Sequence, residues 1–155
     1  MEPGAEIRKA GPDDAAAVAA IVQDAYAKYV PRIGRPPRPM LEDYAALIRD
    51  GIVWVLTEGA QAVGVLVLED RPDHLLLQNV ALAPHAQGRG LGKRLLDYAE
   101  QEALARGYGE IRLYTNEKMT ENIAIYTKIG YRETHRDTAD YRRLFMSKRL
   151  AKSAT

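Results

Sequence analysis

The chain has 155 residues, of which 46% are hydrophobic and 28% are charged. This length and balance are typical of one globular domain, which we expect over residues 1–150 with a frayed tail over residues 151–155. The formal net charge of +1 predicts no general attraction to nucleic acid or to an anionic membrane. The absence of cysteine excludes disulfides and a cysteine nucleophile.

The amino terminus shows no basic segment followed by an apolar core, so we expect no signal peptide. The longest apolar runs lie around residues 65–68 and 75–77 and are far too short to span a bilayer. A cytoplasmic protein without a bound metal is therefore expected.

The first half of the chain predicts strands and helices separated by a proline-rich segment. A strand over residues 6–10 precedes a helix that starts at Pro12-Asp13-Asp14, with an aspartate as its cap and acidic residues in its first turn. Residues 31–39 hold four prolines, one glycine and three arginines, which excludes a regular helix. A second helix is expected over residues 41–50, with Gly51 as its carboxyl-terminal cap.

The second half begins with a predicted hairpin of strands over residues 52–57 and 62–68. A fourth strand covers residues 74–82, and a helix follows from about Gly90 to Gly107. The remaining expected elements are a strand at 110–115, a helix at 121–129 with Thr120 as its cap and Gly130 as its stop, and strands at 131–138 and 141–148. This order predicts a mixed α/β sheet covered by helices on both faces.

The most distinctive motif is Gln87-Gly88-Arg89-Gly90-Leu91-Gly92, which joins an apolar strand to an amphipathic helix. The first N–H groups of a helix lack internal partners, and the helix dipole places partial positive charge there. Glycines allow the backbone to approach an anion closely. The motif therefore predicts a phosphate site, although a turn that only changes the chain direction is the alternative.

Two common phosphate motifs do not fit this loop. A Walker A loop would need Ser or Thr after Gly92-Lys93, where Arg94 stands, and a glycine where Gln87 stands. A dinucleotide fingerprint would need its third glycine at Lys93. The pattern that remains is Gln-x-x-Gly-x-Gly.

This pattern follows a strand that ends Asn79-Val80-Ala81-Leu82-Ala83-Pro84 and resembles the pyrophosphate loop of the GNAT N-acetyltransferase superfamily. A second segment, residues 122–131, resembles the family's stretch in which Asn, Ala, Tyr, Gly and an aromatic residue follow in that order. The predicted element order also resembles the GNAT fold. The resemblance implies a mostly antiparallel seven-stranded sheet that is splayed between its fourth and fifth strands and flanked by four helices.

The resemblance implies acetyl-coenzyme A as co-substrate, bound where the fourth and fifth strands part. The acyl-pantetheine arm would pair with the fourth strand, and the Leu82 N–H would stabilise the negative charge that develops on the thioester oxygen. Lys93 is equally well explained as a solvated helix residue. The residues implied to contact the coenzyme are Val80, Ala81, Leu82, Ala83, Gln87, Gly88, Arg89, Gly90, Leu91, Gly92, Lys93, Asn116, Asn122 and Tyr126.

The resemblance further implies that Tyr126 is the general acid that protonates the departing thiolate. A phenol with an ordinary pKa of about 10 is almost wholly protonated at neutral pH, so it is able to donate. Tyr131, by contrast, is expected at the edge of the core. The fourth strand offers Gln78 and Asn79 but no carboxylate, so we expect the amine to lose its proton through water, aided by Glu69.

The acceptor is the least defined part of the prediction. In the family fold, the segment between the first two helices and the last hairpin wall the acceptor site, which nominates Tyr29, Arg32, Arg35, Arg38, Tyr114 and Tyr141. The three arginines are either ligands of a carboxylate on an amino-acid-like amine or solvated charges. A peptide amine, a homodimer and a non-catalytic acyl-coenzyme A sensor stay open as alternatives.

Overall fold

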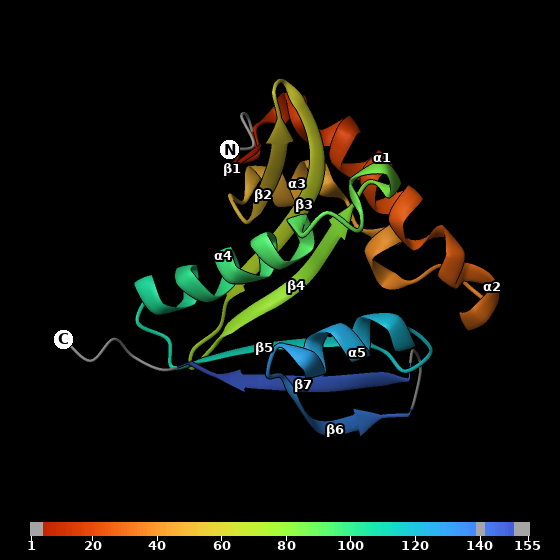
Figure 1. The fold of residues 1–155 in the computed structure, drawn as a ribbon, viewed down its shortest axis with the longest axis vertical. Coiled ribbons are helices and arrows are strands. Elements are labelled where there is room, and N and C mark those ends of the chain that lie inside the picture. Colours follow the sequence, from red (N-terminus) through yellow and green to blue (C-terminus); the bar gives the residue numbers. More distant parts are fainter. Residues whose placement is uncertain (1–4, 139–141, 151–155) are drawn as a thin grey trace.

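A seven-stranded sheet runs through the computed structural model, which describes residues 5–138 and 142–150 (Figure 1). The strands lie side by side in the order β1-β2-β3-β4-β5-β7-β6. Their bounds are β1 Ala5–Lys9, β2 Val53–Glu58, β3 Gln61–Asp70, β4 Leu75–Leu82, β5 Glu110–Asn116, β6 Arg132–Asp137 and β7 Arg143–Arg149. All neighbouring strands are antiparallel except β4 and β5, so the predicted mixed sheet is confirmed.

Helices cover both faces of the sheet, as the element order predicts. In the described part of the chain, the four helices of six residues or more are α1 Ala15–Tyr26, α3 Tyr44–Arg49, α4 Leu91–Ala105 and α5 Thr120–Lys128. A single turn, α2 Val30–Ile33, and short 3-10 segments at Pro12–Asp14, Ala27–Tyr29, Arg38–Leu41 and Pro84–Ala86 complete the described helical structure.

The two faces of the sheet hold separate hydrophobic clusters. On β2, Val53 and Val55 belong to the cluster that contains α1 and α3 residues, whereas Trp54 and Leu56 belong to the cluster that contains α4 residues and Tyr126 of α5. All four side chains are buried. This explains why residues 53–56 of β2 are all apolar, because a strand segment covered on both faces has no solvent side.

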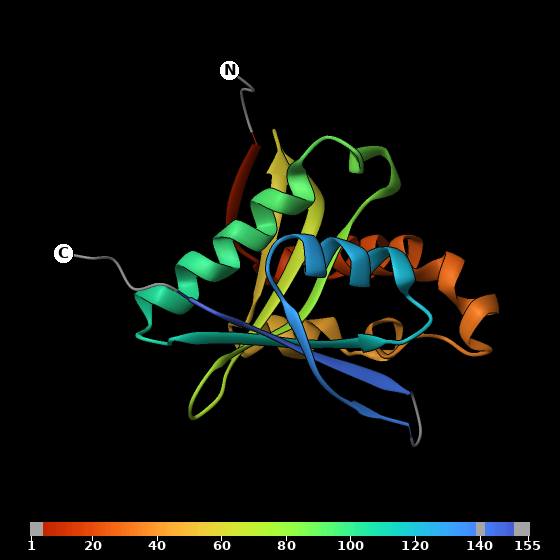
Figure 2. The same cartoon turned by 60° about the horizontal axis from the view of Figure 1, so that its bottom comes forward.

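The sheet divides at its only described parallel pair. Residues 75–77 of β4 pair with residues 111–113 of β5, and beyond them β4 pairs only with β3 while β5 pairs with β7. Figures 1 and 2 show the two strands diverging from this short contact. The predicted splay is therefore present, and the edge of β4 that faces β5 has no strand partner from residue 78 onward.

Gly64 on β3 allows Leu82 to pack closely against the sheet. A Cβ at this position would lie 3.0 Å from Leu82 Cδ2, 3.1 Å from Leu95 Cδ1 and 3.2 Å from Leu56 Cβ. Leu82 is thus held between β3 and α4 by contacts that leave no room for a methyl group.

The proline-rich segment differs from its prediction at both ends. Helix α2 includes Pro31, which is tolerated because the first turn of a helix needs no N–H donor at that position. The second helix, expected over residues 41–50, is the shorter α3, because Asp43 caps it by accepting the Ala46 N–H (3.2 Å).

Two expected helix caps are also wrong. Thr120 is the first residue of α5 rather than its cap, and Met119 occupies the cap position without a side-chain hydrogen bond. Asp14 precedes α1, but its carboxylate accepts the Gly11 N–H (2.7 Å) and pairs with Arg8 instead of capping that helix. The predicted tail over residues 151–155 lies outside the described residues. Within the described residues, no helix has the length and apolar character needed to span a membrane.

Candidate active site

The free edge of β4 presents main-chain groups to the gap between the strands. The Ala83 N–H donates to the Val63 carbonyl on β3 (2.8 Å). Because successive strand residues direct their N–H and C=O groups to opposite edges, the groups of Leu82 point away from β3. The Leu82 carbonyl accordingly accepts from Gln87 Nε2 (3.1 Å). The Leu82 N–H therefore faces the gap.

The glycine loop places the start of α4 beside this edge. Gly88 and Gly90 have φ angles of +78° and +82°, a conformation that favours glycine, and no other heavy atom lies within 4 Å of where a Cβ would stand. Gly90 is the cap of α4, and the Arg94 N–H donates to its carbonyl (3.2 Å). The N–H groups of residues 91–93 precede this bond and have no partner within the helix, as an anion site requires.

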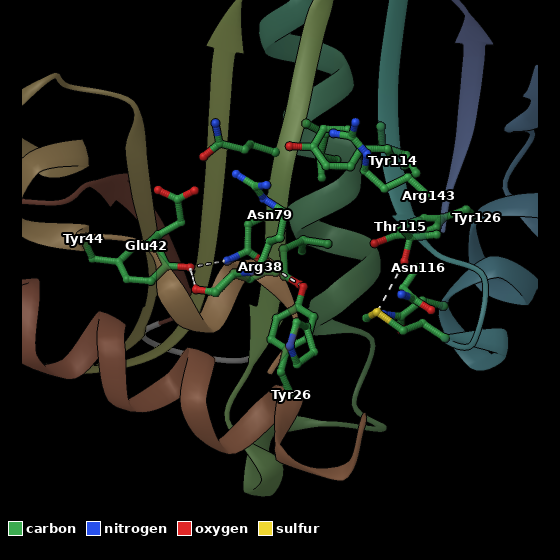
Figure 3. A pocket seen from close by; sticks show the side chains of 18 residues that line it. Tyr26, Arg38, Glu42, Tyr44, Asn79, Tyr114, Thr115, Asn116, Tyr126 and Arg143 are labelled. Atoms are coloured by element: carbon green, nitrogen blue, oxygen red, sulfur yellow. Dashed lines mark hydrogen bonds between the residues drawn. The ribbon is translucent and has the colours of Figure 1, made fainter. Parts of the chain in front are cut away.

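Two cavities flank this edge. We name the first the loop cavity; its lining residues are Ala25, Tyr26, Lys28, Tyr29, Val80, Ala81, Leu82, Gln87, Gly88, Gly90, Gly92, Lys93, Leu96, Glu121, Asn122, Ile125 and Tyr126. We name the second the proline cavity (Figure 3); its lining residues are Tyr26, Pro37, Arg38, Pro39, Glu42, Tyr44, Leu77, Gln78, Asn79, Val80, Leu113, Tyr114, Thr115, Asn116, Met119, Asn122, Tyr126 and Arg143. Four residues belong to both: Tyr26, Val80, Asn122 and Tyr126.

Tyr126 lies where the two cavities meet. Its side chain comes from α5, on the opposite side of the proline cavity from Tyr44 and Glu42 (Figure 3). Burial, with a smaller contribution from nearby Tyr29, raises the pKa of the Tyr126 phenol above its ordinary value. The hydroxyl thus stays protonated and, among the described residues, makes no hydrogen bond, so its proton is available to a ligand.

Tyr131 lies inside the core rather than at its edge, where it was expected. Its ring packs edge-on against Tyr126 with a centroid separation of 5.8 Å. Its side chain is buried, and its hydroxyl has no hydrogen-bond partner among the described residues. Burial raises the pKa of this phenol as well, but it lines neither cavity.

A buried amide, Asn79, is a feature that the sequence analysis did not select. It sits on β4 with 4% of its surface exposed, and it bonds the hydroxyls of Tyr26 on α1 and Tyr44 on α3. A polar residue in the middle of an apolar strand was the available signal, because a buried amide needs partners. Its partners, however, come from segments 53 and 35 residues away in sequence.

The proline cavity also carries charged side chains, of which the sequence analysis nominated Arg38 but not Glu42 or Arg143. Glu42 lies between the Arg38–Leu41 segment and α3, and it is the carboxylate among the described lining residues of this cavity. Arg38 and Arg143 line the same cavity, and Arg143 also pairs with Asp137 (3.1 Å) and stacks over Tyr114. The proline cavity therefore combines largely apolar and aromatic walls with both signs of charge.

Several predicted site residues lie outside both cavities. The guanidinium of Arg89 pairs with Glu58 on the β2–β3 hairpin, so its side chain is directed toward the hairpin while its backbone remains in the loop. Glu69 accepts from Gln78 Nε2 (2.9 Å) and pairs with Arg71 (3.4 Å). Of the other predicted residues, Ala83, Leu91, Arg32 and Arg35 line neither cavity, and Tyr141 lies outside the described residues.

Arg32 instead joins two elements beside the loop cavity. It makes a two-pronged ion pair with Glu121 at the start of α5, with N–O distances of 2.5 and 2.9 Å. Hydrogen bonds from Arg32 lower the pKa of Glu121 to about 2, so this carboxylate is ionised at neutral pH. The pair links α2 to α5 next to Tyr29, over which the guanidinium lies at 5.2 Å.

The remaining predicted residues are brought together. Val80, Ala81, Leu82, Gln87, Gly88, Gly90, Gly92 and Lys93 line the loop cavity, Tyr29 lines its α1 side, and Tyr114 and Asn116 line the proline cavity. Lys93 also pairs with Asp97 one turn along α4 (2.8 Å). Within residues 5–138 and 142–150, no cluster of three His, Asp or Glu side chains suits a metal ion.

Known proteins share this sequence pattern and this fold. Residues 49–133 match the family described as an acetyltransferase (GNAT) domain. A mycothiol acetyltransferase of Nocardia farcinica is 40% identical over 60 residues, which are 39% of this chain and 20% of that protein. The N-alpha-acetyltransferase 80 of Mus musculus is 36% identical over 62 residues, 40% of this chain and 18% of that protein. The chain thus matches only about a fifth of the length of these relatives.

Solved structures resemble the chain over nearly its whole length. The PaiA N-acetyltransferase of Thermoplasma acidophilum, solved with coenzyme A, has a TM-score of 0.75 at 19% identity and covers 95% of this chain and 99% of its own. The ribosomal-protein-S18-alanine N-acetyltransferase of Escherichia coli has a TM-score of 0.75 at 21% identity and covers 97% of this chain and 96% of its own. Because the family match spans more than half of the sequence, the chain belongs to the GNAT acetyltransferases, which use acetyl-coenzyme A as acetyl donor.

Proposed function

We propose that this chain transfers the acetyl group of acetyl-coenzyme A directly to a primary amine of a small molecule, and that residues 1–150 act as one catalytic domain. The observation that carries the proposal is the meeting of the loop cavity and the proline cavity at Tyr126. Two ligands that enter from opposite sides would have their reacting atoms side by side at this point.

The coenzyme would occupy the loop cavity. The N–H groups of residues 88–92 would hold the pyrophosphate, with Lys93 adding positive charge at the start of α4. The free edge of β4 at Val80 and Leu82 would pair with the pantetheine arm as an added strand does. Asn122 lies at the junction of the cavities and Asn116 in the proline cavity, within the lining that the acyl end of the coenzyme would meet.

The acetyl step needs one donor for the carbonyl oxygen and one for the leaving sulfur. The Leu82 N–H faces the gap and would stabilise the negative charge on the carbonyl oxygen as the amine nitrogen bonds to the carbonyl carbon. When the carbon–sulfur bond breaks, the Tyr126 hydroxyl would give its proton to the thiolate and be reprotonated from solvent. The products would be the acetylated amine and free coenzyme A.

The attacking amine must also lose a proton. Glu69 is bonded to Gln78 and Arg71 and lines neither cavity, so it would reach the amine only through other groups. The proton would instead leave through water in the proline cavity, where Glu42 supplies a carboxylate. In this arrangement Glu69 contributes at most by orienting Gln78.

The acceptor would lie in the proline cavity, between Tyr114, Arg38 and Arg143. Two guanidinium groups and one carboxylate suit an amine that also bears a carboxylate, as in amino acids and related compounds. Tyr29 lines the loop cavity, and Arg32 and Arg35 line neither cavity, so they would influence the acceptor less than Arg38 does.

A thiol-release assay tests the proposed function. Purified protein is supplied with acetyl-coenzyme A and, in separate reactions, free amino acids, amino-acid amides, alkylamines and a short peptide. Release of coenzyme A thiol that depends on a small amine, with a matching acetylated product by mass spectrometry, is expected. Tight coenzyme binding by calorimetry without thiol release from any amine would point to an acyl-coenzyme A sensor. Release with the peptide alone would point to a peptide acceptor.

A further inference from the structure

A chain of buried hydrogen bonds ends at Tyr26, one of the residues shared by the two cavities. The Tyr44 hydroxyl bonds the Pro39 carbonyl (2.6 Å), Asn79 Nδ2 bonds the Tyr44 oxygen (2.9 Å), and the Tyr26 hydroxyl bonds Asn79 Oδ1 (2.6 Å). Tyr26, Tyr44 and Asn79 are each at most 6% exposed. The chain joins α1, β4, α3 and the proline-rich segment.

The Pro39 carbonyl fixes the donor and the acceptor of every hydrogen bond in this series. A main-chain carbonyl only accepts, so Tyr44 must donate its single proton to Pro39. The Tyr44 oxygen is then an acceptor, and the Asn79 atom that faces it must be the NH₂ group. The other Asn79 atom is therefore the carbonyl oxygen, and Tyr26 must donate to it.

The proton of Tyr26 is thus committed away from any ligand. Its second neighbour, the Val80 carbonyl at 3.3 Å, is also only an acceptor. Since a phenol has one proton, the remaining capacity of the Tyr26 oxygen is to accept, and Tyr26 lines both cavities. Tyr126 has the opposite property, because its hydroxyl proton has no described acceptor.

We propose that Tyr26 accepts a hydrogen bond from an N–H of the acceptor amine and so turns the nitrogen lone pair toward the thioester carbon. This inference rests on the proposed function and adds a second substrate-contacting tyrosine to it. Tyr26 holds the amine on one side of the reacting carbon, and Tyr126 donates to the sulfur on the other. Asn79 and Tyr44 are positioning residues that keep the Tyr26 oxygen in its accepting state.

This role differs from that of a general base. Burial raises the pKa of Tyr26 well above its ordinary value, so the phenol stays neutral and does not take up the proton of the amine in its own right. Tyr26 would orient the amine while water removes the proton. The assigned acceptor class is therefore an amine with at least one N–H left after deprotonation, whereas an alcohol would meet Tyr26 with only its single, reacting proton.

The test is Tyr26→Phe, assayed with the amine that the wild type acetylates fastest among amino acids, amino-acid amides and alkylamines. Loss of one neutral hydrogen bond is expected to lower kcat/KM for that amine about ten-fold. The Kd of acetyl-coenzyme A, measured by calorimetry, should stay within two-fold of the wild type. Tyr98→Phe is the matched control, because Tyr98 packs on Trp54 and lines neither cavity.

Tyr44→Phe tests the orientation of the Asn79 amide while the Tyr26 hydroxyl is kept. Without Tyr44 the anchor at Pro39 is lost, so Asn79 is free to turn its NH₂ group toward Tyr26 and to reverse the polarity. We expect an intermediate fall in kcat/KM for the amine, again with unchanged coenzyme affinity. If Tyr26→Phe does not give a cooperative melting curve, this second variant decides the matter on the same criteria.

The outcomes separate this inference from the function on which it rests. A wild type that acetylates no amine overturns the proposed function and the role of Tyr26 with it. An active wild type with an unaltered kcat/KM in Tyr26→Phe overturns the role of Tyr26 alone. A weaker coenzyme affinity that accounts for the whole loss of activity would also overturn it, because Tyr26 would then act on the coenzyme.

Discussion

The loop cavity and the proline cavity share one wall but are built from different kinds of groups. The loop cavity includes two stretches of main chain whose N–H groups lack partners within the part of the chain that the structure describes, one at the start of α4 and one at the edge of β4. The proline cavity offers side chains that come from α1, the proline-rich segment, β4, β5, α5 and β7. A backbone site suits a ligand that every relative shares, whereas a side-chain site allows the acceptor to change with a few substitutions.

The largest expected effect falls on the junction of the two cavities. Tyr126→Phe should lower kcat by roughly a hundred-fold, the usual contribution of a positioned general acid, and leave the Kd of acetyl-coenzyme A little changed. Steady-state kinetics and calorimetry measure the two quantities. Tyr131→Phe is the control, since its hydroxyl lines neither cavity. An unchanged rate in Tyr126→Phe would remove that residue from the mechanism.

A smaller effect is expected at Gly90, where the loop backbone adopts a conformation that favours glycine. Gly90→Ala places a side chain at a φ of +82°, which costs about 1–2 kcal/mol and displaces the N–H groups that follow. We expect the Kd of acetyl-coenzyme A to rise about ten-fold by calorimetry. Gly107→Ala introduces the same strain at the other end of α4, where φ is +87°. Equal losses of affinity in both variants would mean that the loop has no special role in binding.

The pH dependence of kcat tests the environment of Tyr126. A general acid works while it is protonated. Burial raises the pKa of this phenol, so the fall in kcat caused by its deprotonation moves to higher pH. We therefore expect no fall in kcat that is attributable to Tyr126 below a pH of about 10, the ordinary phenol pKa. A fall near pH 8 or 9 that disappears in Tyr126→Phe would contradict the buried environment described here.

The smallest effect is expected at Glu69. Its carboxylate is outside both cavities, so Glu69→Gln should change kcat/KM by no more than about two-fold and leave the shape of the pH profile unaltered. The same assay with Glu42→Gln gives the comparison, because Glu42 lines the proline cavity. A larger loss of kcat/KM in Glu69→Gln than in Glu42→Gln would indicate that Glu69, on β3, assists deprotonation of the amine.

The sequence predicted the loop cavity, with its main-chain groups, better than the proline cavity, which is formed by side chains from many elements. The glycine loop and the element order are local patterns, and both lead to the confirmed fold. The partners of Asn79 could not be predicted, because Tyr26 and Tyr44 meet it only after α1 and α3 pack on β4. Arg89 was expected to face the phosphate, yet its pairing with Glu58 depends on the position of a hairpin 31 residues away.

Local rules also failed where tertiary contacts outweighed them. Thr120 has the chemistry of a helix cap, but the Met119 N–H bonds the Asn116 carbonyl (3.0 Å), which ties the turn to the end of β5, and α5 starts one residue earlier than a Thr120 cap requires. Pro31 was expected to prevent a helix, yet it stands in the first turn of α2, where its missing N–H has no consequence.

Gly64 would connect the hydrophobic interior with the thioester in the binding mode proposed here, through its contact with Leu82. Leu82 rests on the bare backbone at that point, and the same residue carries the amide that faces the gap. We expect Gly64→Ala to displace Leu82 and its N–H group, and so to lower kcat, although every residue that lines the loop cavity and the proline cavity is unchanged. Reactivity is thus open to adjustment by substitutions behind the cavity lining, at residues that are not themselves part of it.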